Sequence, residues 1–126
     1  MKPEEEYKNA LSDAQYKVLR EKATEAPFSG KYNLHFEKGN YQCGACGISL
    51  FSSEGKYDAG CGWPSFHSPI DNDKIKTQKD LSNNKERTEI LCKNCGSHLG
   101  HVFNDGPQPT GLRYCINSLA LSFEPY

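Results

Sequence analysis

Two short segments with the same pattern, Cys-Gly-Ala-Cys at residues 43–46 and Cys-Lys-Asn-Cys at residues 92–95, are the most informative part of this chain. Each Cys-x-x-Cys turn directs two sulfur atoms toward one point, and two such turns supply the four thiolates of a tetrahedral zinc site. Four free thiols or two local redox pairs are the alternatives, and iron is the alternative metal. The pattern predicts a structural zinc ion, which would stabilise the fold. Its expected ligands are Cys43, Cys46, Cys92 and Cys95.

The composition indicates one small domain in a reducing compartment. With 126 residues, 36% of them hydrophobic, the chain can bury only a modest core, which a bound metal would reinforce. The 15 basic and 16 acidic residues form no basic stripe, so nucleic-acid binding is not expected. No apolar run approaches the roughly 20 residues that a membrane span needs. Residues 1–6 do not resemble a signal peptide, and we therefore expect a cytoplasmic protein, where cysteines serve metals or catalysis more often than disulfides.

The single domain, residues 1–126, is expected to contain a helical region at residues 1–25 and a β core at residues 30–126. Pro3 suits the first position of a helix, and Ser12 with Gln15 forms a capping-box pattern. After residue 30, short β-branched and aromatic segments alternate with turn residues, which is typical of an all-β sandwich or open barrel. The expected strands are Tyr41–Cys43, Ile48–Ser52, Ile75–Lys79, Arg87–Leu91, Leu99–Phe103 and Arg113–Phe123, with polar loops at Asp71–Lys74 and Leu81–Lys85.

Cys115 is one of two cysteines that belong to neither pair. Because side chains alternate along a strand, Arg113, Cys115 and Asn117 would share one face, which Leu119, Leu121 and Phe123 would continue. A guanidinium on that face would lower the pKa of the Cys115 thiol and favour the nucleophilic thiolate. An inert buried cysteine on a β-strand is the alternative.

The segment just before this strand supplies acid–base groups. His98 and His101 lie three residues apart, and Asp105 follows them before a Gly-Pro turn. Histidine is the usual proton donor and acceptor near neutral pH. A structural or metal-binding role is the alternative for these histidines, although the four cysteines already complete the obvious metal site.

The other spare cysteine, Cys61, lies in the stretch Gly-Cys-Gly-Trp-Pro at residues 60–64. Glycines on both sides predict a mobile loop, which suits a sulfur atom that must move to a partner. Trp63, held by Pro64, is a candidate apolar wall for a small substrate group. A position in the core is the alternative for Trp63.

In these segments the chain resembles the B-type methionine sulfoxide reductases, which reduce methionine-(R)-sulfoxide. The matching segments are residues 27–30, 43–46, 60–66, 92–95, 98–103, 105–107 and 113–117, and the resemblance extends from about Tyr16 to Glu124. It implies two twisted antiparallel sheets with N-terminal helices packed outside. It also implies that Cys115 attacks the sulfoxide sulfur and that Trp63, with Phe66 nearby, holds the substrate. The resemblance further implies that the polar half of the pocket is formed by His98, His101, Asp105, Arg113 and Asn117.

The expected reaction begins with attack by the Cys115 thiolate while His98 or His101 protonates the oxygen. Cys61 then converts the resulting sulfenic acid into a Cys61–Cys115 disulfide, which thioredoxin reduces by thiol exchange. The substrate is free or protein-bound methionine-(R)-sulfoxide, and a monomer is expected. His35 and His67 receive no role. A non-catalytic zinc-stabilised β module that binds a protein is the alternative, but it leaves the two spare cysteines unexplained.

Overall fold

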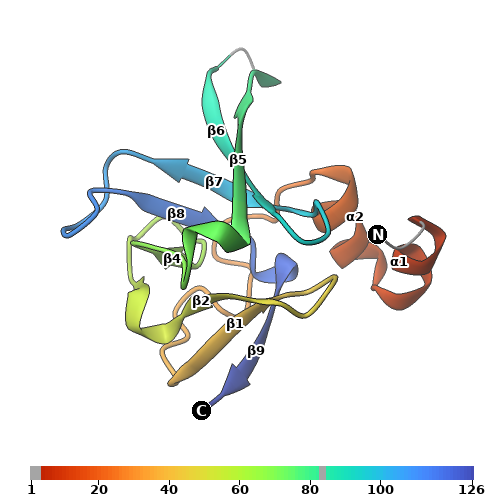
Figure 1. Ribbon diagram of the computed structural model, residues 1–126, viewed down its shortest axis with the longest axis horizontal. Coiled ribbons are helices and arrows are strands. Elements are labelled where there is room, and N and C mark those ends of the chain that lie inside the picture. The colour runs from red at the N-terminus through yellow and green to blue at the C-terminus, as the bar shows by residue number, and fades with distance from the viewer. Residues whose placement is uncertain (1–3, 83–84) are drawn as a thin grey trace.

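The computed structural model describes residues 4–82 and 85–126 and consists of two antiparallel sheets with two short helices beside them (Figure 1). The expected class, mainly β with two sheets and N-terminal helices, is therefore confirmed. Among the described residues, no helix is both long and apolar enough to cross a membrane.

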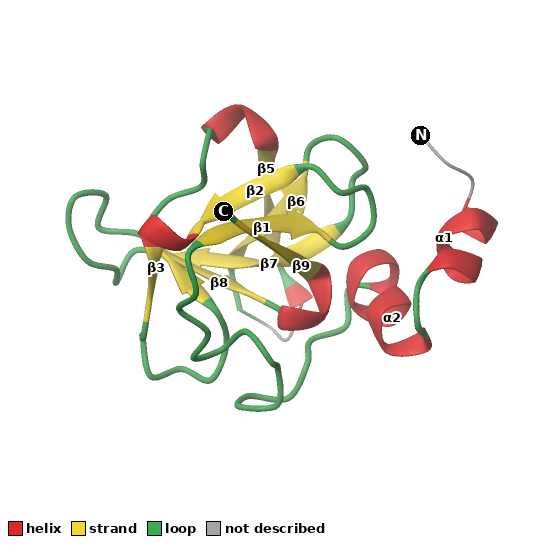
Figure 2. Cartoon of the chain, turned by 90° about the horizontal axis from the view of Figure 1, so that it is seen from below, coloured by secondary structure: helices red, strands yellow, loops and turns green. Residues whose placement is uncertain are grey.

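The helices α1 (Glu4–Ala10) and α2 (Asp13–Glu21) stand at one end of the sheets, on the right in Figure 2. The expected capping box is present, since the Gln15 N–H donates to Ser12 Oγ and the Ser12 N–H donates to Gln15 Oε1. Val18 and Leu19 of α2 are buried in the core, which docks this helix on the β structure. The expectation for Pro3 lies outside the described residues.

The smaller sheet has the strand order β2-β1-β9. Its strands are β1 (Gly39–Cys43), β2 (Ser49–Ser52) and β9 (Leu121–Pro125). The first Cys-x-x-Cys turn begins at the last residue of β1 and leads toward β2. This sheet therefore holds one half of the cysteine cluster.

The larger sheet has the order β3-β4-β8-β7-β6-β5. Its strands are β3 (Lys56–Tyr57), β4 (Ser65–Phe66), β5 (Ile75–Asp80), β6 (Arg87–Cys92), β7 (His98–Phe103) and β8 (Arg113–Ile116). The strands β3 and β4 are too short to leave a periodic signal in the sequence. A 3₁₀ turn, Asn72–Lys74, occupies most of the expected loop at Asp71–Lys74, and the loop expected at Leu81–Lys85 lies partly outside the described residues.

The expected continuous strand from Arg113 to Phe123 is wrong. The chain leaves the larger sheet after Ile116, forms a 3₁₀ turn at Ser118–Ala120 and enters the smaller sheet as β9. Hydrogen bonds cause the break, because Asn117 donates its side-chain amide to Leu99 O and the Leu119 N–H donates to a buried carboxyl. The alternation therefore stops before Leu119, and Leu121 and Phe123 belong to the other sheet.

The core lies between the two sheets and is rich in aromatic rings. Phe51 of the smaller sheet stacks on Phe66 of the larger sheet, with ring centroids 4.4 Å apart, and Tyr41 meets Phe66 edge-on. Phe66 is completely buried. Its ring therefore joins the two sheets, and its expected role in substrate binding stays a prediction.

Candidate active site and metal site

The four paired cysteines converge at one end of the two sheets. The sulfur atoms of Cys43, Cys46, Cys92 and Cys95 all lie within 4.8 Å of one another, and the Cys43–Cys95 and Cys46–Cys92 pairs are each 3.7 Å apart. Sulfur atoms about 2.3 Å from a central zinc ion in a tetrahedron are about 3.8 Å apart. The cluster therefore has the dimensions of a metal site with four sulfur ligands, and three of the four cysteines are buried.

Both halves of this cluster have the same backbone geometry. Gly47 and Gly96 follow the second cysteine of each pair with φ of 82° and 77°, a conformation that favours glycine. Each glycine N–H donates to the carbonyl of the first cysteine, at 2.8 Å for Cys43 and 2.7 Å for Cys92. From α2, Arg20 donates to the Cys95 carbonyl at 2.8 Å, so the helix also supports the cluster.

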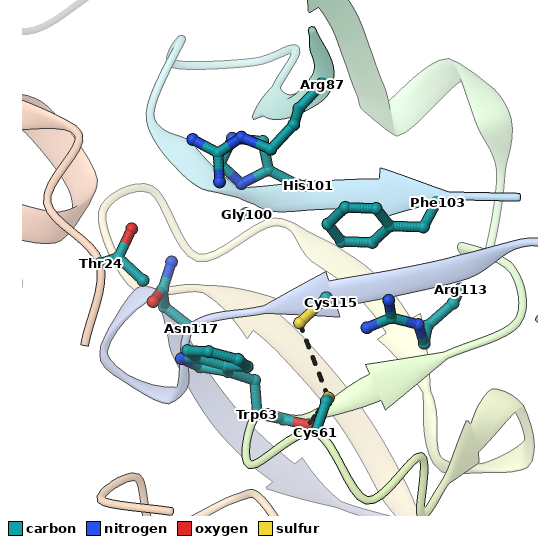
Figure 3. A pocket seen from close by; sticks show the side chains of 10 residues that line it. All are labelled: Thr24, Cys61, Trp63, Arg87, Gly100, His101, Phe103, Arg113, Cys115 and Asn117. Atoms are coloured by element: carbon teal, nitrogen blue, oxygen red, sulfur yellow. Dashed lines mark hydrogen bonds between the residues drawn. The ribbon is translucent and has the colours of Figure 1, made fainter. Parts of the chain in front are cut away.

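A cavity of about 240 Å³ lies along the larger sheet (Figure 3), and none of the four clustered cysteines lines it. The residues that line it are Thr24, Cys61, Trp63, Arg87, Gly100, His101, Phe103, Arg113, Cys115 and Asn117. The two spare cysteines thus lie in one wall, and Trp63 and Arg113 stand on either side of them in Figure 3. The combination of paired thiols, an indole ring and a cationic group is suited to redox chemistry on a small, partly apolar group.

The two spare thiols are already in contact. Cys61 Sγ lies 3.8 Å from Cys115 Sγ, and the two are not joined by a disulfide. The loop between β3 and β4 delivers Cys61, and Ser65 at its end holds the Cys61 thiol at 3.4 Å. The sequence suggested that the Cys61 sulfur would have to move to reach a partner. The fold instead places the two thiols side by side.

The ionisation of these two thiols differs from the expectation for Cys115. Burial raises the pKa of Cys115 to about 12, and Arg113 only partly opposes this effect. Burial also acts to raise the pKa of Cys61, but the hydrogen bond with Ser65 and its other polar contacts outweigh burial and lower the pKa. In the reduced protein, Cys61 is therefore the more acidic of the two thiols.

Arg113 favours the ionised form of Cys115 less than burial opposes it, and its guanidinium is also held by other groups. It donates to both carboxylate oxygens of Asp105, with Nε–Oδ1 at 2.9 Å and Nη2–Oδ2 at 3.2 Å, and it lies over the Phe103 ring. Asp105 is largely exposed and does not line the cavity. It therefore contributes to the site by orienting Arg113.

A β-bulge places His98 and His101 together. Residues three apart on a regular strand point to opposite faces, but the β6–β7 register shifts between Ile90 and Leu91, opposite Gly100 and His98. The two imidazole rings consequently lie with centroids 5.5 Å apart. Only His101 lines the cavity, whereas His98 is buried behind it.

Each histidine is paired with a carboxylate that the sequence reasoning missed. His101 Nε2 lies 2.7 Å from Asp80 Oδ2, and His98 Nδ1 lies 2.6 Å from Glu89 Oε2. The hydrogen bond from His101 lowers the pKa of Asp80, so this carboxylate stays ionised near neutral pH. An ionised carboxylate can only accept, and Nε2 of His101 therefore carries the proton. Arg87, 3.3 Å from Asp80, completes this polar group.

Glu89 comes from β6, the neighbour of the strand β7 that carries the histidines, and Asp80 comes from β5, one strand further away. Asp80 lies opposite Arg87 in the β5–β6 pair, and Glu89 lies opposite His101 in the β6–β7 pair. Alternation within β6 does place Arg87 and Glu89 on one face, but only the strand order shows which residues that face meets.

His35, for which no function is expected, lies in the aromatic cluster of the core, where its ring is hydrogen-bonded to the Tyr41 hydroxyl.

Comparison with known proteins gives a consistent result. A family model described as the SelR domain matches residues 11–125. The chain is 55% identical over 123 residues to a protein of Leptospira interrogans named peptide methionine sulfoxide reductase MsrB, covering 98% of this chain and 94% of the relative. Proteins of the same name from Bradyrhizobium diazoefficiens (55% identical, 99% and 90% covered) and Methanosarcina barkeri (54% identical, 98% and 87% covered) are similar over nearly the same length.

The order in which the two spare thiols react with an alkylating reagent tests their pKa order. At pH 7 a thiol with a pKa of about 12 is ionised to only about one part in 10⁵, so iodoacetamide should modify Cys61 well before Cys115. Peptide mass spectrometry over a time course measures both rates. The Cys115→Ser variant is the control and should still be modified rapidly at Cys61. Faster modification of Cys115 in the reduced protein would show that Arg113 outweighs burial.

Proposed function

We propose that this chain, which belongs to the SelR domain family of MsrB-type methionine sulfoxide reductases, reduces methionine-(R)-sulfoxide to methionine. The observation that carries this proposal is the Cys61–Cys115 pair, 3.8 Å apart in the wall of a cavity that also presents an indole ring and an imidazole. The substrate class comes from the relatives, and the assignment of each step comes from the position of each side chain.

In the first step, Cys115 acts as the nucleophile toward the sulfoxide sulfur. The new bond joins Cys115 Sγ to the substrate, the oxygen is transferred to Cys115, and methionine leaves while Cys115 becomes a sulfenic acid. Because burial keeps Cys115 protonated in the empty site, we infer that its proton departs only when substrate is bound. The polarised S=O group and the Arg113 guanidinium then lie beside the developing thiolate.

His101 is the better candidate for moving that proton, because it lines the cavity and His98 does not. With its Nε2–H donated to Asp80, the ring keeps Nδ1 available to accept the thiol proton and pass it to the sulfoxide oxygen. The Asp80 carboxylate would stabilise the imidazolium formed in between. His98 and Glu89 form a buried pair that supports the His101 ring from behind.

In the second step, Cys61 attacks the sulfur of the Cys115 sulfenic acid. A disulfide forms between the two residues and the oxygen leaves as water, so no atom remains on the enzyme. The 3.8 Å separation supports this pairing, because only a small movement is needed to reach the S–S bond length of about 2 Å. Thioredoxin is our proposed reductant, and it would restore both thiols by thiol–disulfide exchange.

The choice of the R epimer is proposed to follow from the two sides of the cavity. Trp63 offers an apolar surface for the substrate methyl group, and His101 and Asn117 offer polar groups for its oxygen. With the sulfur atom held against Cys115, only one epimer can satisfy both sides. We further infer that residues 1–126 act as a single monomeric domain in the cytoplasm and that the metal is zinc, whose ligands would be the four clustered cysteines.

Turnover of the two separated epimers tests the function directly. Wild-type protein with thioredoxin should reduce an R-sulfoxide peptide and leave the S epimer unchanged, as measured by chromatography of the products. Cys115→Ser should abolish the reaction. Cys61→Ser should release one methionine per chain and then stop. Reduction of the S epimer at an equal rate, or normal turnover by Cys115→Ser, would refute the proposed mechanism.

Asp80→Asn tests the role of the carboxylate beside His101. The amide is close in size but cannot balance an imidazolium, so the rate of a single turnover should fall by about tenfold or more with little change in thermal stability. Asp73→Asn, an exchange at an exposed carboxylate, is the control and should not change the rate. An unaltered single-turnover rate and pH profile for Asp80→Asn would remove His101 and Asp80 from the proton path.

Metal removal tests the proposed zinc ion. Binding of zinc by small folded peptides has an apparent free energy on the order of 10 kcal/mol, so chelation should lower the melting temperature sharply, and added zinc should restore it. Elemental analysis should give one zinc per chain, and this ratio should fall in Cys92→Ser but not in Cys61→Ser. Metal-free protein with an unchanged melting temperature would contradict the proposal.

A further inference from the structure

A buried carboxyl group lies behind the cavity and has no place in the reaction described above. Glu25, in the segment that follows α2, is only 6% exposed. Its Oε1 accepts the Leu119 N–H at 2.9 Å, and its Oε2 is buried without a hydrogen-bond partner among the described residues. Burial of a carboxyl group costs free energy unless its oxygen atoms are hydrogen-bonded, and only one of the two Glu25 oxygens is.

The backbone of Glu25 holds two residues of the cavity wall at once. Its N–H donates to Asn117 Oδ1 at 3.0 Å, and its carbonyl accepts the indole N–H of Trp63 at 3.0 Å. Asn117 and Trp63 come from segments that are far apart in the sequence, and both line the cavity. The relative placement of the polar and apolar sides of the cavity therefore depends on where residue 25 lies.

The side chain of Glu25 fixes that position. Leu119, whose N–H it accepts, belongs to the 3₁₀ turn that directly follows Asn117, so the carboxyl ties residue 25 to the same turn that carries this amide. The Glu25 carboxyl also packs tightly against Gly30. A Cβ atom on Gly30 would overlap both Glu25 Oε2 and Ser118 Oγ. The side chain thus has little freedom to take another position.

We propose that Glu25 is a positioning residue for substrate binding, which anchors its own backbone so that Trp63 and Asn117 are held at a fixed separation across the cavity. Glu25 itself touches neither the sulfur pair nor the substrate in this account. The predicted effect on substrate affinity rests on the proposed function, whereas the predicted effect on Trp63 does not.

The same protein offers a matched control. Ser118 lies in this 3₁₀ turn, and its Oγ accepts the Tyr32 N–H at 3.1 Å. Ser118→Ala therefore also deprives a backbone N–H of its buried acceptor. Tyr32 does not line the cavity, and Ser118 contacts neither Trp63 nor the Asn117 side chain through this bond. A merely structural role for Glu25 would make the two alanine variants alike.

The experiment compares Glu25→Ala, Glu25→Gln and Ser118→Ala at a temperature where far-ultraviolet circular dichroism shows all of them folded. Trp63 is the only tryptophan, so its fluorescence reports this one contact. Glu25→Ala should shift the emission to longer wavelength, make it easier to quench with iodide, and raise KM for the sulfoxide peptide about tenfold, with a smaller change in kcat. Glu25→Gln keeps an acceptor for Leu119 and should stay within about twofold of wild type in KM.

Ser118→Ala should lower the melting temperature while leaving both the emission and KM close to wild type. Wild-type emission and KM in Glu25→Ala would overturn the proposal. Equal changes in Ser118→Ala, or Glu25→Gln behaving like Glu25→Ala, would also overturn it, because the acceptor oxygen would then not be the cause. Inactive wild-type protein would refute the proposed function instead, and the fluorescence comparison would still test the role of Glu25.

Discussion

The convergence of four cysteine sulfur atoms, two from each sheet, is the constraint on which the rest of the structure depends. Cys43 lies at the end of β1 in the smaller sheet, and Cys92 lies at the end of β6 in the larger sheet. The turn that carries Cys92 and Cys95 leads directly into β7, which pairs with β8. A metal bound at this cluster would therefore fix the start of the strand that carries His101 and, through it, the strand that carries Cys115.

At the cavity, burial and hydrogen bonds set the ionisation of the two spare thiols. Burial raises the pKa of Cys115 and keeps it protonated while the cavity is empty, whereas hydrogen bonds lower the pKa of Cys61 and make it the more acidic partner. In the proposed reaction, Asp80 and His101 would compensate for the poor ionisation of Cys115, because together they could accept the thiol proton when substrate arrives. Reactivity is thus proposed to depend on the bound substrate more than on a permanently ionised thiol.

Local patterns in the sequence predicted the cluster of four cysteines, the helix cap and the two cysteines outside it, because turn geometry and spacing are local properties. The errors arose where the structure depends on strand pairing. The bulge opposite Leu91 brings His98 and His101 together, and Asp80 reaches His101 only through the strand order β5-β6-β7. The burial of the Phe66 ring between the two sheets was likewise not readable from its place in a sequence motif. A single sequence does not encode these pairings in a form that spacing can reveal.

We propose that sulfur has two separate roles in this protein, with four atoms held for a metal and two kept for electron transfer. The most direct measurement is a disulfide map of the reduced protein after reaction with one equivalent of an R-sulfoxide peptide, with no reductant present. The account predicts one methionine formed per chain and one new link, between residues 61 and 115, while the other four cysteines remain unlinked. Methionine formation with a link to any cysteine of the metal cluster, or with no link at all, would contradict it.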